Sequence, residues 1–239
     1  MSLQRRFSKT KQGVSRLDDS KKWKKARDNQ KMKDKNATII VDLIPSLDEI
    51  KKNLHKDARW GIGKAEKEGL KVEQTDREED WKEFYEIYKN TMKEGGIMPS
   101  SLEKLKENTS TFLVCKKEGR IIAGAGIWFR NVYSKEIPRL YFNASLKDFQ
   151  SLQPNNLLYW SCIVWSKEKN YKEFDLGGWQ INAREHLQGV NKFKEKWGSV
   201  VYFEKEYPLF KAIGRKLVRK FYLIKKINQR FRRNKDAQK

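Results

Sequence analysis

The sequence has little cysteine and histidine and no long apolar segment. Among 239 residues there are two cysteines, two histidines and five prolines. No run of 18 apolar residues is present, which excludes a transmembrane helix of ordinary length. The first residues are basic, but no apolar segment of the kind found in secretory signals follows them. We therefore expect a cytoplasmic protein.

The two cysteines, Cys115 and Cys162, lie in apolar runs, with neither a second cysteine nor a histidine beside them. This context is typical of buried free thiols rather than of a disulfide or a zinc site. We accordingly expect no bound metal and no cofactor.

Aromatic residues and positive charge are abundant. Hydrophobic residues make up 38% of the chain and aromatic residues 12%, enough to build a core, so a wholly disordered chain is excluded. The net charge of +22 is concentrated at the ends: residues 1–36 carry 13 basic and 4 acidic side chains, and residues 205–239 carry 13 and 2. Such ends suit a polyanionic partner.

The pattern of apolar residues predicts strands and helices in a mixed order. Capping boxes at Ser46-x-x-Glu49 and Thr75-x-x-Glu78 each predict the start of a helix, the first of which would run to Gly69. Helices are also predicted from residue 101, over 154–169, over 189–197 and from residue 208. Strands are predicted at 37–43, 111–115, 120–129, 139–144, 173–176 and 200–204, the second and third forming a hairpin. This order favours an α+β fold.

Three segments carry a resemblance to a known family. They are the basic stretch 53–69 after a β-branched run, the segment 141–145 with the Pro154-x-x-Leu157-Leu158-Tyr159-Trp160 helix start, and Asp175-Leu176-Gly177-Gly178 followed by 189–198. In this order they resemble the Fem-type aminoacyltransferases of peptidoglycan interpeptide bridges. The resemblance covers roughly residues 37–205 and corresponds to a single catalytic half.

The resemblance implies a GNAT-like fold, a mixed and largely antiparallel sheet flanked by helices. On this reading residues 1–36 form a basic arm, 37–207 the transferase domain and 208–239 a basic amphipathic helix. The implied reaction transfers an amino acid from aminoacyl-tRNA to an amine of a peptidoglycan precursor, which in some cases is lipid-linked. Peripheral contact with the anionic inner face of the membrane is an alternative use of the basic ends.

An aminoacyl ester is already activated, so its transfer needs alignment and oxyanion stabilisation more than a protein nucleophile. The family motif places Lys194 at a functional Phe-Lys pair, where its ammonium could meet the developing oxyanion. Asp175, the second catalytic candidate, would accept the amine proton, or else cap the turn that follows it. Without the motif, Lys194 would be one of many solvated cations.

The candidates for substrate binding come from the same three segments. Gly177 and Gly178 allow a backbone to approach a substrate closely, although a plain turn explains them equally well. Phe193 would face either the substrate or the core. Arg59 and Lys64 lie on the basic stretch 53–69, where they could bind phosphates or remain exposed to solvent. The full set of substrate-binding candidates is Phe193, Gly177, Gly178, Tyr141, Tyr159, Trp160, Arg59 and Lys64.

Two other functions fit the sequence. One is acyl transfer from acyl-CoA on the same fold, which the lack of glycine in residues 145–154 disfavours, because glycine-containing loops expose the backbone amides that hold the pyrophosphate. The other is a non-catalytic module that binds RNA or a membrane through the charged ends. The apolar positions after residue 208 suit an interfacial helix as well as a helix packed on the domain.

Overall fold

The fold is described from a computed structural model, which defines residues 35–132 and 135–204. Its helices are α2 (Leu47–Asn53), α3 (Lys56–Lys67), α4 (Glu78–Glu94), α5 (Leu102–Glu107), α6 (Pro154–Glu168) and α7 (Glu185–Glu195), with a 3-10 helix η1 (Lys147–Leu152). Its strands are β1 (Lys35–Asp42), β2 (Lys71–Gln74), β3 (Thr111–Lys117), β4 (Arg120–Val132), β5 (Lys135–Ser145), β6 (Glu173–Trp179) and β7 (Ser199–Glu204). The predicted arm and the helix from residue 208 lie outside the described residues.

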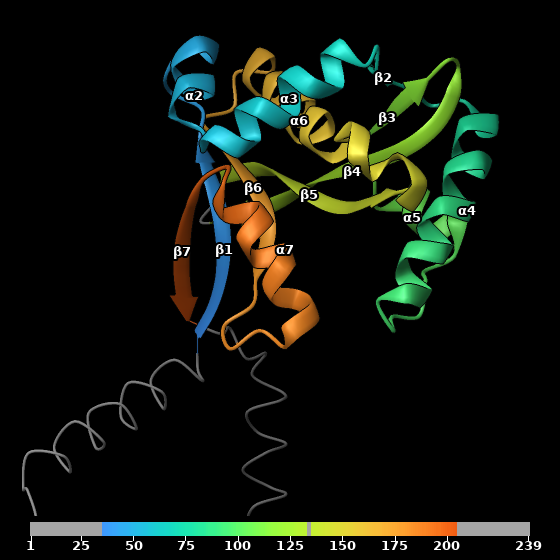
Figure 1. Cartoon of the computed structure of the whole chain (residues 1–239). Helices are drawn as coiled ribbons and strands as arrows, with labels where there is room; N and C mark the ends of the chain where they lie inside the picture. The colour runs from blue at the N-terminus through green and yellow to red at the C-terminus, as the bar shows by residue number, and fades with distance from the viewer. Residues whose placement is uncertain (1–34, 133–134, 205–239) are drawn as a thin grey trace, which may run out of the picture. The chain divides into compact units, whose positions relative to one another are not determined.

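The strands form one seven-stranded sheet in the order β2-β3-β4-β5-β6-β1-β7 (Figure 1). The pairs β2/β3, β3/β4, β4/β5 and β1/β6 are antiparallel. β5 and β6 are parallel and pair at one register position, Arg139 opposite Asp175. The predicted α+β fold with a mixed, largely antiparallel sheet is confirmed, and the β5/β6 junction is where this sheet changes direction.

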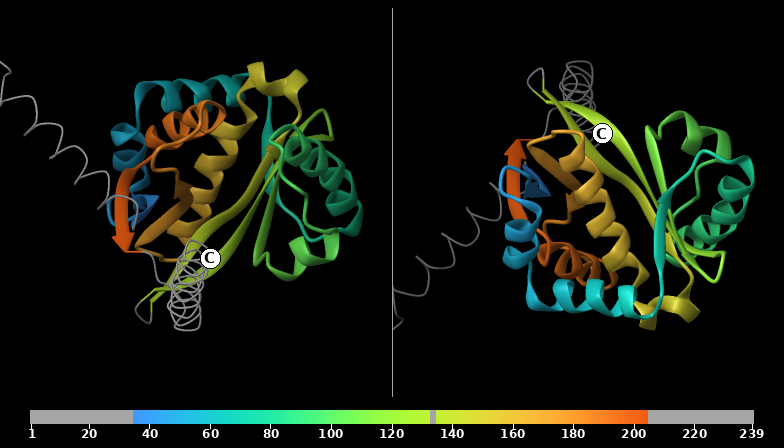
Figure 2. Two further views of the ribbon diagram at one scale, coloured as in Figure 1. Left: turned by 90° about the horizontal axis from the view of Figure 1, so that it is seen from below. Right: turned by 90° about the horizontal axis from the view of Figure 1, so that it is seen from above.

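The core has two parts because strand residues alternate between the two faces of the sheet. On one face, α3 and α6 bury Ile62 and Leu158 against residues such as Leu113 and Ile122. On the other, α4 buries an aromatic group that includes Trp81, Phe84, Tyr88, Phe112 and Phe142. Figure 2 shows helices on both sides of the sheet. The aromatic residues that recur at helical spacing along α4 are therefore core.

Most predicted elements are present, including the hairpin, where Glu118 and Gly119 both have positive φ (52° and 84°) and so make the tight turn between β3 and β4. The buried free thiols are also confirmed: both cysteines are buried and unpaired, and burial raises the pKa of each to about 12.

The helix predicted from Ser46 to Gly69 is two helices. The Ser46/Glu49 capping box is present, but α2 ends at Leu54, whose ψ of 154° is extended. The Arg59 guanidinium donates to the carbonyls of Lys52 and Leu54 at 2.6 and 2.5 Å, and the His55 N–H donates to the Lys196 carbonyl at 3.0 Å. The break is stabilised by these two sets of contacts, one of which comes from a distant part of the chain.

Three further predictions are corrected. Thr75 does not cap α4, which begins after Arg77; the Thr75 hydroxyl donates instead to the buried Asp80 carboxylate at 2.7 Å. The strand predicted at 173–176 continues through both glycines to Trp179, and α7 begins at Glu185, four residues before its predicted start. β2 and η1 were not predicted.

Gly198, between α7 and β7, has no room for a side chain. A Cβ there would lie 2.3 Å from the Ile40 carbonyl oxygen, which belongs to the backbone of β1. We expect Gly198→Ala to lower the free energy of unfolding by about 1–3 kcal/mol, the usual cost of overpacking. The matched control is Gly63→Ala in α3, where nothing lies within 4 Å and helix propensity favours alanine. Equal denaturation midpoints for the two variants would contradict this prediction.

Candidate functional site

A cluster of charged side chains occupies the junction where β5 and β6 meet. Its centre is Asp175, which is 2% exposed. Its carboxylate accepts hydrogen bonds from the Thr38 hydroxyl, from the Gly177 N–H at 2.7 Å and from the Arg139 guanidinium at 3.2 Å. Arg130 is ion-paired with the same carboxylate at 3.6 Å. Asp175 thus ties together β1, β4, β5 and β6.

Gly177 needs to be glycine in this cluster. Its φ is +81°, a conformation that side-chain-bearing residues rarely adopt, and the Asp175 carboxylate holds the turn through the Gly177 N–H. A Cβ at Gly177 would point into a crowded space, 3.3 Å from the Leu140 carbonyl oxygen and 3.5 Å from the Lys194 ammonium. The contacts of Asp175 are those of a residue that caps the turn.

Lys194 reaches this turn from α7. Its ammonium donates to the Gly178 carbonyl at 3.2 Å, which among the described residues is the one hydrogen bond made by its three N–H donors. Burial and, to a smaller extent, neighbouring Arg139 lower the pKa of Lys194, Asp175 partly opposes them, and together they place that pKa at about 8. Lys194 is therefore mostly charged at neutral pH and loses its charge as the pH rises through 8.

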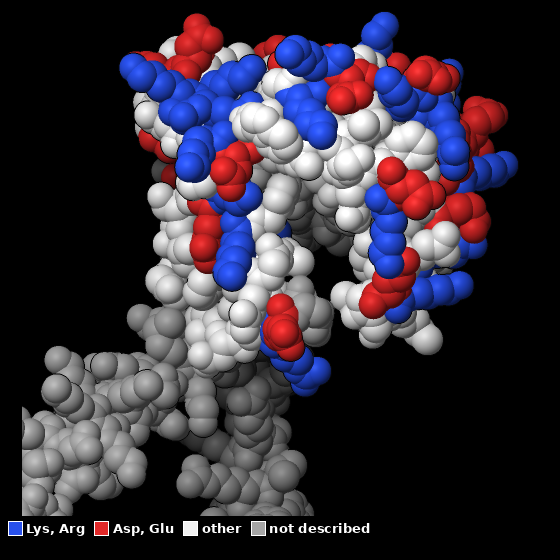
Figure 3. All heavy atoms as spheres, viewed as in Figure 1, with Lys and Arg blue, Asp and Glu red and all other residues white. Residues whose placement is uncertain are grey.

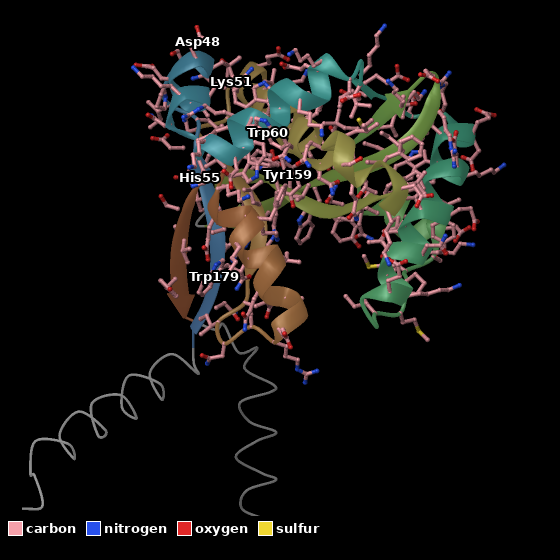
Figure 4. All side chains as sticks on the ribbon, viewed as in Figure 1. Asp48, Lys51, His55, Trp60, Tyr159 and Trp179 are labelled. Atoms are coloured by element: carbon pink, nitrogen blue, oxygen red, sulfur yellow. The ribbon has the colours of Figure 1, made fainter. Side chains whose placement is uncertain are left out.

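Phe193 and Tyr159 lie beside this cluster, with ring centroids 5.1 Å apart in an edge-to-face arrangement. Both line a pocket of about 490 Å³ between α7 and the start of α6. Figure 4 shows Tyr159 where α6 approaches α7. Burial raises the pKa of the Tyr159 hydroxyl, which stays neutral.

The structure brings six of the ten predicted site residues together: Lys194, Asp175, Gly177 and Gly178 in the cluster, Phe193 and Tyr159 in the adjoining pocket. The remaining four have other contacts. Arg59 caps α2, and Lys64 lies over the ring of Trp60 at 5.4 Å. The Trp160 ring lies under the Lys51 ammonium at 5.5 Å, and Tyr141 packs against Trp128 and Phe142.

Sequence reasoning missed the two arginines of the cluster and the polar side chains of the pocket. Arg130 and Arg139 lie on strands 36 to 45 positions from Asp175, and no local pattern marks them. The polar pocket could have been inferred from the sequence, because four of the seven residues 150–156 are Asn or Gln.

Residues 52–195 match the family described as the acetyltransferase (GNAT) domain. The chain belongs to this family. The predicted GNAT-like class is confirmed. No curated protein sequence gives a significant match.

Two solved structures share the fold of this GNAT-domain chain. The crystal structure of FemX is 17% identical with a TM-score of 0.60, and the match covers 71% of this chain and 60% of FemX. The C-terminal domain of a putative lysylphosphatidylglycerol synthetase from Agrobacterium fabrum is 14% identical with a TM-score of 0.53, covering 70% of this chain and 58% of that domain. This chain spans about three fifths of the length of either one.

Proposed function

We propose that this acyltransferase moves an aminoacyl group from aminoacyl-tRNA to an amine of a peptidoglycan precursor. The observation that carries the proposal is the Lys194 ammonium, held at the Gly178 carbonyl beside a turn that has no side chain at Gly177. A charged group that is desolvated and fixed in place interacts more strongly with a developing oxyanion than a solvated lysine does.

In the proposed reaction the acceptor amine attacks the ester carbonyl of the donor. A C–N bond forms, the carbonyl oxygen takes up negative charge, and the Lys194 ammonium stabilises that charge. The C–O bond to the ribose then breaks, and the proton lost by the amine ends on the departing ribose hydroxyl. Because the ester is already activated, no covalent enzyme intermediate is needed.

The likeness to FemX supports the Fem-type assignment of this fold. Asp175 serves in this proposal to hold the turn rather than to accept the amine proton, because donors from four strands already occupy its oxygens. The basic segments before residue 36 and after residue 207 would attract tRNA phosphates or, at the inner face of the membrane, anionic lipids around a lipid-linked acceptor. None of the described helices is long and apolar enough to cross a membrane.

Acyl-CoA is the second candidate donor, because the matched family is described by acetyl transfer. One assay with the full chain distinguishes the two donors. The protein is incubated with a muropeptide precursor as acceptor and, as donor, either tRNA charged with labelled amino acids or labelled acetyl-CoA. We expect label to reach the acceptor from aminoacyl-tRNA. Transfer from acetyl-CoA together with none from any charged tRNA would overturn the proposed donor.

A further inference from the structure

The pocket between α7 and the start of α6 differs in chemistry from the rest of this highly charged chain. We call it the amide pocket; it is lined by Asn143 from β5, Gln150 from η1, Gln153, Pro154, Asn155, Asn156 and Tyr159 from the start of α6, and Gly189, Val190 and Phe193 from α7. None of the described residues that line it is Lys, Arg, Asp or Glu, although charged residues make up 35% of the chain. Figure 3 shows the hollow beside α7 as largely uncharged surface, whereas charged side chains crowd the surrounding rim.

Five of the ten lining residues carry a carboxamide, and these amides orient one another. Asn143 donates to the Asn155 side chain at 3.1 Å and to the Gly124 carbonyl at 3.3 Å, which uses both of its N–H bonds. Asn155 donates to the Ser145 hydroxyl at 3.0 Å, and Asn156 donates to Gln153 at 2.7 Å. A fixed set of neutral donors and acceptors recognises a neutral ligand that has both.

The start of α6 does not offer the cradle of amides that a pyrophosphate needs. Pro154 has no N–H, and the N–H groups of Asn156 and Leu157 both point to the Gln153 carbonyl, at 3.0 and 3.4 Å. Gln153 itself has a φ of 65° and closes the preceding turn through a bond to Gln150. An anionic ligand would therefore lose its hydration here without gaining a charged partner from the described lining residues.

The wall formed by α7 is apolar. Val190 and Phe193, three positions apart, share one face of the helix, and the Val190 side chain is 46% exposed. An apolar and aromatic wall facing a wall of amides suits a flat heterocycle, which stacks on the first and forms hydrogen bonds at its edge with the second. Asn and Gln side chains pair with the edge of adenine in particular.

We propose that the amide pocket binds the uncharged purine base of the donor's terminal nucleoside. This inference rests on the proposed function, because the adenosine that carries the ester is the part of aminoacyl-tRNA nearest the reacting carbonyl. Phe193, which lines the pocket, directly precedes Lys194 in α7, so the pocket and the ammonium share one helix. Coenzyme A also carries adenine, so discrimination between the two donors would rest on its pyrophosphate, to which the described pocket lining offers no cationic side chain.

The test uses the full chain with two probes, adenosine and an amide-linked 3′-aminoacylamino-3′-deoxyadenosine, and with coenzyme A for comparison. Binding is followed by NMR through the side-chain amide signals of Asn143, Gln150 and Asn155. We expect both nucleosides to shift these signals. Phe193→Leu, which removes the ring but keeps an apolar side chain, should weaken binding about tenfold or more. Gln150→Ala, at an exposed position, should weaken binding without affecting the fold.

Gln188→Ala is the matched control, because Gln188 is exposed on α7 outside the pocket. It should bind both probes like the unaltered chain. Adenosine that shifts none of the pocket amides, or binds equally to the Phe193→Leu and Gln150→Ala variants, overturns the inference even if aminoacyl transfer is observed. Nucleoside binding at the pocket without any aminoacyl transfer would instead contradict the proposed function and leave a nucleoside site.

Discussion

Lys194→Met is expected to reduce transfer at least about 100-fold, the usual cost of removing one oxyanion partner from a preorganised site. Methionine keeps the length and apolar stem of the lysine but has no positive charge. To the part of the chain that the structure describes, the Lys194 ammonium makes one hydrogen bond, to Gly178 at 3.2 Å, so its loss should change folding much less than turnover. Initial rates and a thermal melt on the same preparation would measure the two effects.

Lys192→Met is the control, because Lys192 lies two positions earlier on α7 and is exposed. The transfer rate of this variant should equal that of the unaltered chain. A near-normal transfer rate in Lys194→Met would show that Lys194 has no part in the mechanism. The pH profile gives a second measurement. Because the pKa of Lys194 is about 8, its charge is present below that pH and lost above it, so kcat should contain an alkaline decline that Lys194→Met lacks.

Asp175→Asn is expected to lower the free energy of unfolding by about 3 kcal/mol. Asparagine has nearly the same shape and can still accept the Gly177 N–H. It leaves the guanidiniums of Arg130 and Arg139, 30% and 21% exposed, without the buried carboxylate that they share. Chemical denaturation monitored by circular dichroism would measure the loss.

Asp148→Asn on η1 is the matched control, because Asp148 is exposed and should tolerate the same loss of charge. Equal stability of the two variants would mean that Asp175 does not hold the junction together. A second readout separates positioning from stability. Asp175 raises the pKa of Lys194, so in Asp175→Asn that pKa should fall below about 8 and the alkaline decline of kcat should move to lower pH. An alkaline decline of kcat at the same pH in Asp175→Asn and in the unaltered chain would contradict the effect of Asp175 on the pKa of Lys194.

Most helices and strands could be predicted because their signals are local. The Lys117-Glu118-Gly119 turn between two β-branched runs predicts a hairpin by itself, and the aromatic residues at helical spacing in 81–92 predict a buried helix face. Where tertiary contacts compete with local pattern, prediction failed. The split at Leu54 depends on the Lys196 carbonyl, more than 140 positions away, and the capping bond expected at Thr75 is replaced by a bond to buried Asp80.

By itself, the sequence determined the class of fold, the buried free thiols, the positive charge of the ends and the motif that contains Lys194. These follow from composition and from residues within a few positions of one another. Only the tertiary structure decided what surrounds Lys194. The β5/β6 junction brings Arg130, Arg139 and Asp175 together, and α7 closes the amide pocket against residues 143–159. Such a site depends on contacts between strands and helices far apart in the chain, which no local pattern encodes.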